Sequence, residues 1–275
     1  MKERIDVLLV NKGFFPSREK AKKAVMAGEV SVDGLIFDKP GMSVSEDALI
    51  TVKNDNCPYV SRGGLKLAKA IDEFNIDLTD FVCMDIGAST GGFTDCMLQN
   101  KASKIYAVDV GYGQLDYKLR IDPRVCNIEK CNFRYFDKES IDDAIDFASI
   151  DVSFISLKHI FPVLTNLLNQ GTSEDSRGKV VALIKPQFEA GREQVGKKGI
   201  VKDPKVHEEV ISNVIQYARE QDLYPIDLSY SPITGAKGNI EYLVYLNKGS
   251  DLGYNDWEER IRKVVELSHD RRFRT

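Results

Sequence analysis

Strands of the buried type alternate with helical segments from residue 63 to the end of the chain, and this alternation restricts the fold more than any other feature. Such alternation predicts an α/β fold with a doubly wound, mostly parallel sheet, as in Rossmann-like domains. The expected strands are Phe81–Asp85, Ile105–Asp109, Val125–Ile128, Phe147–Asp151, Lys179–Lys185, Asp227–Ser231 and Glu241–Asn247. The expected helices lie at 63–74, from a glycine-rich turn through Leu98, at 157–168, at 207–220 and at 257–267.

The first 56 residues are organised differently, as two short helices followed by a small sheet. Ser17 is placed to cap the second helix, and Gly28 lies where that helix should end. Asp33 and Gly34 stand between two short apolar runs, which predicts a β-hairpin. The predicted plan is a small α+β domain at 1–56, a linker at 57–62 and a larger domain at 63–275.

The composition favours a soluble, cytoplasmic protein. No stretch approaches the roughly 20 apolar residues that span a bilayer. The five cysteines form no C-x-x-C pair and the chain has three histidines, which argues against a structural zinc site and against a disulfide framework. The net charge of −4 argues mildly against a nucleic-acid binder, although a local basic patch is sufficient for binding.

The stretch F-V-C-M-D-I-G-A-S-T-G-G-F, residues 81–93, runs from a strand through a glycine-rich turn into a helix. Glycines let the backbone turn sharply and approach a ligand closely. Asp109, at the end of the next strand, suits the two hydroxyls of a ribose. Asp85 would repel a pyrophosphate, and it favours a ligand with an amino group and a sulfonium, such as S-adenosylmethionine. The alternative is a tight turn with Asp85 as a helix cap.

Four polar residues are expected at one edge of the sheet. Asp151 and Lys185 end strands, Lys66 comes from the first helix of the larger domain, and Glu241 opens the last strand. Glu241 can share that edge only if its strand runs antiparallel. Taken singly, each has a structural alternative as a solvated, capping or edge charge.

Together these four residues fit the removal of a proton from a ribose hydroxyl. A lysine can accept that proton only if its pKa falls from the usual value of about 10.4. A second lysine and burial lower such a pKa, whereas neighbouring carboxylates raise it. The sequence leaves the balance between these effects open.

Basic residues gather on the second helix of the small domain. This cluster suits contacts with RNA phosphates, and Arg4 extends it, while Arg62 in the linker lies near the proposed active site. Residues 1–56 contain nine basic and nine acidic residues, so only the clustering supports RNA binding. The alternative is a solvated charged face. The helix residues are Arg18, Lys20, Lys22 and Lys23.

Residues 63–247, with D-I-G-A-S-T-G-G-F, I-D-V-S-F, I-K-P-Q-F-E and G-N-I-E-Y, resemble the FtsJ-type ribose methyltransferases. Residues 1–53, with R-I-D-V-L-L, S-R-E-K-A and G-E-V-S-V-D-G, resemble the RNA-binding module first seen in ribosomal protein S-four. Joined through Y-V-S-R-G-G-L-K-L, the two resemble the TlyA family, also known as haemolysin A.

This resemblance implies methylation of the 2′-hydroxyl of cytidines in ribosomal RNA of one or both subunits, with S-adenosylmethionine as cofactor. It implies that the catalytic residues are Lys66, Asp151, Lys185 and Glu241. It also implies that the cofactor is held by Gly87, Ala88, Ser89, Thr90, Gly91, Gly92, Phe93, Asp109 and Asn132.

Three other functions compete with this one. A membrane-lytic toxin needs a spanning or strongly amphipathic segment, and none is apparent. An RNA-binding assembly factor with an inactive methyltransferase domain is disfavoured by the intact set of four residues. A nicotinamide-dependent reductase is disfavoured by Asp85.

Overall fold

The computed structural model describes residues 2–15, 17–52, 57–170, 177–249, 251 and 256–270. The chain forms two compact units, Met1–Cys57 and Pro58–Thr275. The predicted domain boundary at residue 56 lies outside the described residues. Residues 58–62, expected in a linker, belong to the larger unit, where the backbone N–H of Val60 donates to Asp95 at 2.8 Å.

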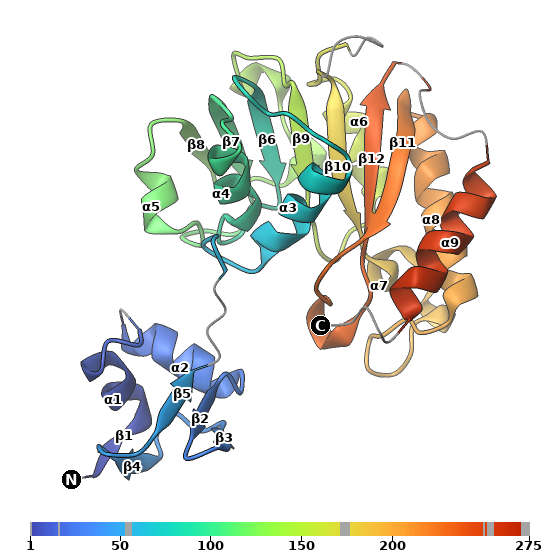
Figure 1. Ribbon diagram of the computed structural model, residues 1–275. Coiled ribbons are helices and arrows are strands. Elements are labelled where there is room, and N and C mark those ends of the chain that lie inside the picture. Colours follow the sequence, from blue (N-terminus) through green and yellow to red (C-terminus); the bar gives the residue numbers. More distant parts are fainter. Residues whose placement is uncertain are drawn as a thin grey trace. The chain divides into compact units, whose positions relative to one another are not determined.

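The smaller unit combines two helices with two small sheets (Figure 1). Strands β1 and β4 pair antiparallel, a pairing that the sequence did not predict, and the other sheet has the order β3-β2-β5. The core lies between the helices and the strands and includes Ile5, Leu9, Val25 and Val30. The elements are β1 (Lys2–Arg4), α1 (Ile5–Asn11), α2 (Arg18–Met26), β2 (Val30–Val32), β3 (Leu35–Phe37), β4 (Ser43–Ser45) and β5 (Ile50–Val52).

Local sequence signals explain where these elements begin and end. The side chain of Ser17 accepts a hydrogen bond from the backbone of Lys20 at 3.4 Å, which caps α2 as predicted. Gly28 follows α2 with φ of 72°, a conformation that favours glycine. Asp33 and Gly34 both have positive φ and join β2 to β3, so the predicted hairpin is confirmed.

The larger unit is built on a seven-stranded sheet of order β11-β12-β10-β9-β6-β7-β8. Strand β12 runs antiparallel to both its neighbours, and the other pairs are parallel, which confirms the predicted mixed α/β sheet. The strands are β6 (Val82–Ile86), β7 (Lys104–Val108), β8 (Val125–Ile128), β9 (Phe147–Ile150), β10 (Lys179–Ile184), β11 (Leu223–Tyr230) and β12 (Tyr242–Lys248).

Helices cover both faces of this sheet (Figure 1). Helices α3, α4 and α5 share one apolar core with one face, and α6, α8 and α9 share a second core with the other. Successive strand residues alternate between these cores, so Cys83 faces α3 and α4 while Met84 faces the opposite side. The helices are α3 (Gly63–Glu73), α4 (Gly92–Gln99), α5 (Tyr117–Arg120), α6 (Phe161–Leu164), α7 (Pro186–Glu189), α8 (Pro204–Arg219) and α9 (Trp257–His269).

The helix expected at 157–168 is wrong over much of its length. A short 3₁₀ turn, Leu157–His159, precedes α6, and the helix ends at Leu164. Leu168 instead forms a parallel bridge with Ile145, whose backbone N–H donates to Leu167. The apolar residues after Leu164 therefore extend the sheet side of the core, a use that helical periodicity alone does not distinguish.

Candidate active site

Four of the predicted site residues meet at the carboxyl edge of the parallel strands. Lys66 lies on α3, Asp151 follows β9, and Lys185 follows β10. Glu241 directly precedes β12, which runs antiparallel to β10, so its start lies beside the end of β10. The antiparallel strand on which the predicted grouping depended is therefore present.

Ion pairs connect these four side chains in one continuous network. The ammonium of Lys66 lies 2.7 Å from Glu241 Oε2 and 3.6 Å from Asp151 Oδ2. The other oxygen of Asp151 lies 2.5 Å from Lys185 Nζ. Both lysine side chains are only 10% exposed and Glu241 is 2% exposed, so little solvent screens the pairs.

The two lysines have different surroundings. Burial lowers the pKa of Lys66, but Asp151 and Glu241 oppose it strongly enough that the pKa is raised above its usual value of 10.5. Among the described residues Lys185 pairs with a single carboxylate, and its Nζ also donates to the hydroxyl of Ser153 at 2.9 Å. Lys66 is thus held as a cation, whereas Lys185 combines one carboxylate with one neutral acceptor.

Two cavities adjoin at this edge of the larger unit. The first, of about 420 Å³, is lined by all four of these residues and by the glycine-rich turn. The second, of about 540 Å³, is lined by Asp109 and Asn132 among others. Residues that line both cavities include Gly87, Ser89, Asp151, Ser153 and Phe154.

The glycine-rich turn packs too tightly for side chains at three positions. A Cβ on Gly87 would lie 2.5 Å from the backbone oxygen of Asp151, and one on Gly92 would lie 2.4 Å from Ser61 Oγ. Gly91 has φ of 93°, and a Cβ there would collide with Leu119. The turn therefore packs directly against Asp151, one of the four charged residues. Of the predicted turn residues, Gly87, Ala88, Ser89, Thr90, Gly92 and Phe93 line the first cavity, and Gly91 lines neither.

Asp109 and Asn132 line the second cavity with hydrogen-bonding capacity left over. Asp109 accepts the backbone N–H groups of Ser89 at 2.8 Å and Gly111 at 2.6 Å, one on each oxygen. Each carboxylate oxygen can accept a further bond, so two hydroxyls of a ligand fit there. Asn132 uses its side-chain oxygen to accept from Arg134, and its amide nitrogen donates to no described residue.

Asp85 does not line either cavity, contrary to its predicted contact with a cofactor. Its side chain is fully buried and accepts hydrogen bonds from Thr94 at 2.6 Å and Ser149 at 3.1 Å. The reason is the alternation of the strand, which turns Asp85 toward α4 and away from the sheet edge. Burial raises the pKa of this carboxyl to about 7.

Phe154 is a site residue that sequence reasoning did not single out. It lines both cavities, is 90% exposed and has φ of 63°, which is uncommon for an aromatic residue. Its ring lies 4.9 Å from that of Phe188, centroid to centroid. An aromatic residue three positions after Asp151 was the available signal, but its exposure depends on the turn.

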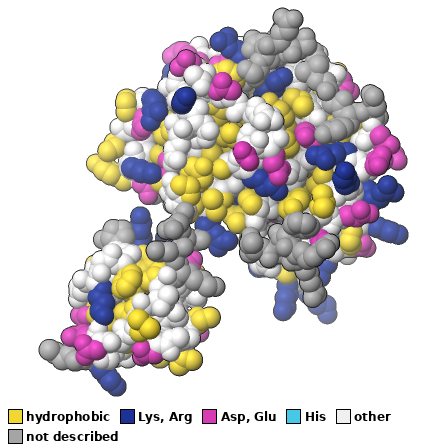
Figure 2. Space-filling model, viewed as in Figure 1, with side chains coloured by type: hydrophobic (Ala, Val, Ile, Leu, Met, Phe, Trp, Pro, Cys, Tyr) yellow, Lys and Arg dark blue, Asp and Glu magenta, His cyan; other side chains and the backbone are white. Residues whose placement is uncertain are grey.

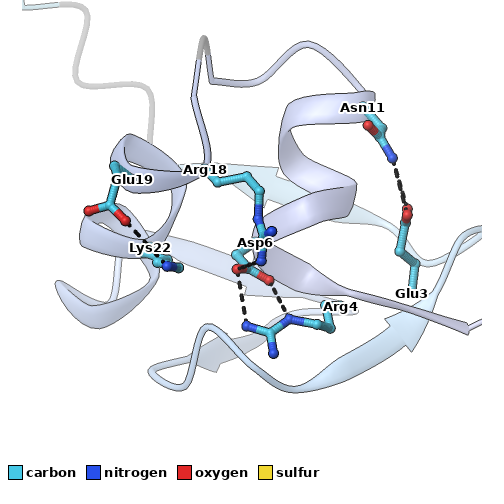
Figure 3. A network of polar contacts seen from close by, with 7 residues as sticks. All are labelled: Glu3, Arg4, Asp6, Asn11, Arg18, Glu19 and Lys22. Carbon is cyan, nitrogen blue, oxygen red and sulfur yellow. Dashed lines mark hydrogen bonds and ion pairs between the residues drawn. The ribbon is translucent and has the colours of Figure 1, made fainter.

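In the smaller unit, Arg4 and Arg18 point toward the same carboxylate (Figure 3). Arg4 donates to both oxygens of Asp6 at 3.0 and 3.1 Å, and Arg18 donates to one at 2.9 Å. Asp6 is completely buried, while the two arginines are about half exposed. One carboxylate thus fixes two cations that remain accessible to an anion.

The other predicted RNA contacts lie on α2 and directly before α3. Lys20 and Lys23 are exposed on α2, and Lys22 pairs with Glu19 at 3.3 Å (Figure 3). Arg62 belongs to the larger unit, where it directly precedes α3.

Two family models match the chain. The model of the FtsJ-like methyltransferases matches residues 59–248, and that of the S4 domain matches residues 3–50. The first match includes both cavities and the four charged residues at the sheet edge, which we call the active-site cluster: Lys66, Asp151, Lys185 and Glu241.

Several relatives are similar over nearly the whole chain. A Bacillus subtilis protein provisionally named rRNA methyltransferase YqxC is 52% identical and aligns with 98% of this chain and 94% of its own length. The 16S/23S rRNA (cytidine-2′-O)-methyltransferase TlyA of Mycobacterium tuberculosis is 39% identical, with 95% and 97% covered. Hemolysin A of Brachyspira hyodysenteriae is 43% identical, with 88% and 98% covered.

A solved structure from Streptococcus thermophilus, provisionally named a hemolysin, has 48% identity and a TM-score of 0.77, and covers 98% of this chain and 96% of its own. Within the described part of this chain, no helix has the length and apolar character that crossing a bilayer requires. The family match spans more than half of the residues, and the matched range contains the whole seven-stranded sheet and the active-site cluster at its edge. The chain belongs to the FtsJ-like methyltransferase family and carries an S4 domain at its amino-terminal end.

Proposed function

We propose that this protein transfers a methyl group from S-adenosylmethionine to the ribose 2′-hydroxyl of cytidine in ribosomal RNA, and that it acts in the cytoplasm. The observation that carries the proposal is the buried cluster of Lys66, Asp151, Lys185 and Glu241 in a cavity that adjoins the glycine-rich turn. Relatives named as rRNA (cytidine-2′-O)-methyltransferases support the choice of substrate.

The second cavity fits the adenosine part of the cofactor. Asp109 has acceptor capacity for the ribose hydroxyls, and the amide nitrogen of Asn132 can donate to the adenine ring. A Cβ on Gly87 or Gly92 would collide with Asp151 or Ser61, so these glycines let the turn pack directly against the wall of the first cavity. When bound, S-adenosylmethionine supplies a methyl group activated by its sulfonium.

Lys185 is the group that we assign as proton acceptor. The 2′-hydroxyl would attack the methyl group that the cofactor supplies, and its proton would pass to Lys185 Nζ, which must be the neutral amine at that moment. Lys66 has a raised pKa and remains a cation, which suits it to hold the ribose oxygen in place. Asp151 contacts both lysines and sets the spacing between their nitrogen atoms.

RNA contacts are assigned to both units. Phosphates would bind the half-exposed arginines that Asp6 holds, and the neighbouring lysines of α2 add positive charge. Phe154 offers an exposed ring at the mouth of both cavities, where the base of the target nucleotide can stack. Residues 1–56 would thus bind phosphates, and residues 63–275, joined to them by 57–62, would bind the target base and carry out the chemistry.

The test is transfer of radiolabelled methyl from S-adenosylmethionine to purified ribosomal subunits from a strain that lacks this protein. Wild type and Lys185→Ala are compared, and the labelled nucleotide is identified after digestion. We expect label on a cytidine ribose with the wild type and none with the variant. Absence of label on either subunit, despite measurable cofactor binding, would contradict the proposal and favour an RNA-binding assembly factor.

A further inference from the structure

Exposed hydrophobic side chains gather on one part of the larger unit. Seven large hydrophobic residues are exposed within the described part of that unit, and five of them lie between residues 110 and 135. Figure 2 shows hydrophobic side chains that protrude at the side carrying α5, next to basic ones. The five are Val110, Tyr112, Tyr117, Ile121 and Tyr135.

Two of these tyrosines each lie under a cation. The Nζ atom of Lys130 is 4.3 Å from the ring centroid of Tyr112, and the guanidinium of Arg134 is 5.3 Å from that of Tyr135. Both rings are more than 70% exposed. Each ring thus has one face against a cation and offers its other face to a ligand.

Lys130 and Arg134 also differ from the basic residues around them. Within the described structure neither of them forms an ion pair, whereas Lys118 pairs with Asp95 and Arg120 pairs with Glu129. Their positive charge is therefore available to an external anion. We call Tyr112, Lys130, Arg134 and Tyr135 the tyrosine rim.

Backbone contacts place the rim beside the second cavity. The backbone N–H of Lys130 donates to Gly111 at 2.9 Å, and that of Cys131 donates to Asp109 at 3.0 Å. Arg134 itself lines that cavity, which adjoins the active-site cavity. A strand of RNA that places one nucleotide in the active site can therefore reach the rim with its neighbours.

We propose that the tyrosine rim binds unpaired RNA nucleotides next to the target, with bases stacked on Tyr112 and Tyr135 and phosphates held by Lys130 and Arg134. Aromatic rings interleaved with cations are the usual surface for single-stranded nucleic acid, because every base has a stacking face and every phosphate a charge. This proposal rests on the proposed RNA substrate.

The test compares the double variant Tyr112→Leu/Tyr135→Leu with Tyr117→Leu, whose exposed tyrosine has no cation over it in the described structure. Affinities for protein-free ribosomal RNA and for S-adenosylmethionine are measured separately by calorimetry. We expect the double variant to bind RNA at least about fivefold more weakly, with cofactor affinity unchanged. Tyr117→Leu should alter neither affinity.

Charge is tested with Lys130→Gln and Arg134→Gln. Each should reduce the slope of log affinity against log salt concentration by about one. Unchanged RNA affinity in the double variant would overturn the inference. So would a loss of cofactor affinity, which would assign the rim to the cofactor site.

Weaker binding to whole subunits with unchanged binding to protein-free RNA would assign the rim to a ribosomal protein and also overturn the inference. RNA affinity is measured without methyl transfer, so the two proposals fail separately. If the wild-type protein transferred no methyl group while the double variant bound RNA more weakly than the wild type, the proposed function would be contradicted and the inference about the rim would be supported.

Discussion

Two aspartates in this chain each bind two cationic side chains, and the pairs differ in how much water reaches the cations. Asp151 lies between Lys66 and Lys185, whose side chains are 10% exposed. Asp6 lies between Arg4 and Arg18, which are about half exposed.

The difference suggests why one group suits catalysis and the other suits binding. Around Asp151 the charges are withdrawn from solvent, so each interaction has a strong effect on protonation, as the raised pKa of Lys66 illustrates. Around Asp6 the carboxylate is buried but the guanidinium groups face water, and arginine stays protonated at any ordinary pH. The arginines of this group can therefore attract phosphates but do not exchange protons at ordinary pH.

The largest effect is expected from Asp151→Asn, which removes the shared carboxylate from both buried lysines. Methyl transfer at saturating RNA should fall at least about 100-fold, because the lysines lose their positions and their balance of charge. Stability toward urea should fall by about 1–3 kcal/mol. Single-turnover transfer and urea unfolding measure the two effects.

The matched control is Asp143→Asn, which removes a carboxylate from the more exposed Lys104. An exposed pair of this kind contributes little, so both measurements should stay close to wild type. Equal losses in the two variants would show that burial is not what distinguishes the active-site cluster.

The next effect concerns RNA affinity. Arg18→Glu places a negative charge beside Asp6 and should weaken binding of ribosomal RNA about tenfold or more at low salt, with a smaller difference at high salt. Cofactor affinity should not change. Lys12→Glu, an equal change of charge at an exposed position of the same unit, is the control for general repulsion. Unchanged RNA affinity in Arg18→Glu would remove this pair of arginines from the RNA-binding surface.

A third aspartate sharpens the comparison, because hydroxyls rather than cations surround it. Asp85 has a folded-state pKa raised from 3.8 to about 7 by burial. Below about pH 4 the group is protonated in both states, so folding stability should fall as pH rises from about 4 to 7 and then level off. Asp85→Asn should remove this decline and leave cofactor affinity within about twofold of wild type. Urea unfolding across this range measures the slope, and a large loss of cofactor affinity would restore the predicted cofactor contact.

The smallest effect is expected at low pH. Hydrogen bonds from Arg4, together with Arg18 and against the effect of burial, lower the pKa of Asp6 to about 2. Its contribution to stability is present above pH 4 and should be lost as pH falls toward 2. The carboxyl resonance of Asp6, followed by NMR, should titrate near pH 2, and a midpoint near 4 would show that the arginines do not hold it.

Positions at strand ends were predictable, because parallel strands bring their carboxyl ends to one edge. Asp151 and Lys185 follow buried strands directly, so the sequence alone predicts that they meet. The predicted capping by Ser17 and the hairpin at Asp33 depend on residues that are neighbours in the chain, and both are present.

The remaining features depend on contacts that sequence spacing does not specify. Asp85 lies one residue before the strand end, and that single step turns it to the opposite environment from the one expected. The pairing of Arg18 with Asp6 links residues twelve positions apart on different helices. The raised pKa of Lys66 follows from distances to two carboxylates, which only the folded chain defines.

One measurement tests most directly whether the buried lysines serve methyl transfer and the half-exposed arginines serve RNA binding. Lys185→Ala and Arg18→Glu are each assayed for the single-turnover rate of methyl transfer at saturating ribosomal RNA and for the dissociation constant of that RNA. We predict that Lys185→Ala abolishes methyl transfer and leaves the dissociation constant of the RNA unchanged. Arg18→Glu should keep the wild-type transfer rate and raise that dissociation constant. A slow rate in Arg18→Glu at saturating RNA, or weak RNA binding in Lys185→Ala, would contradict this separation.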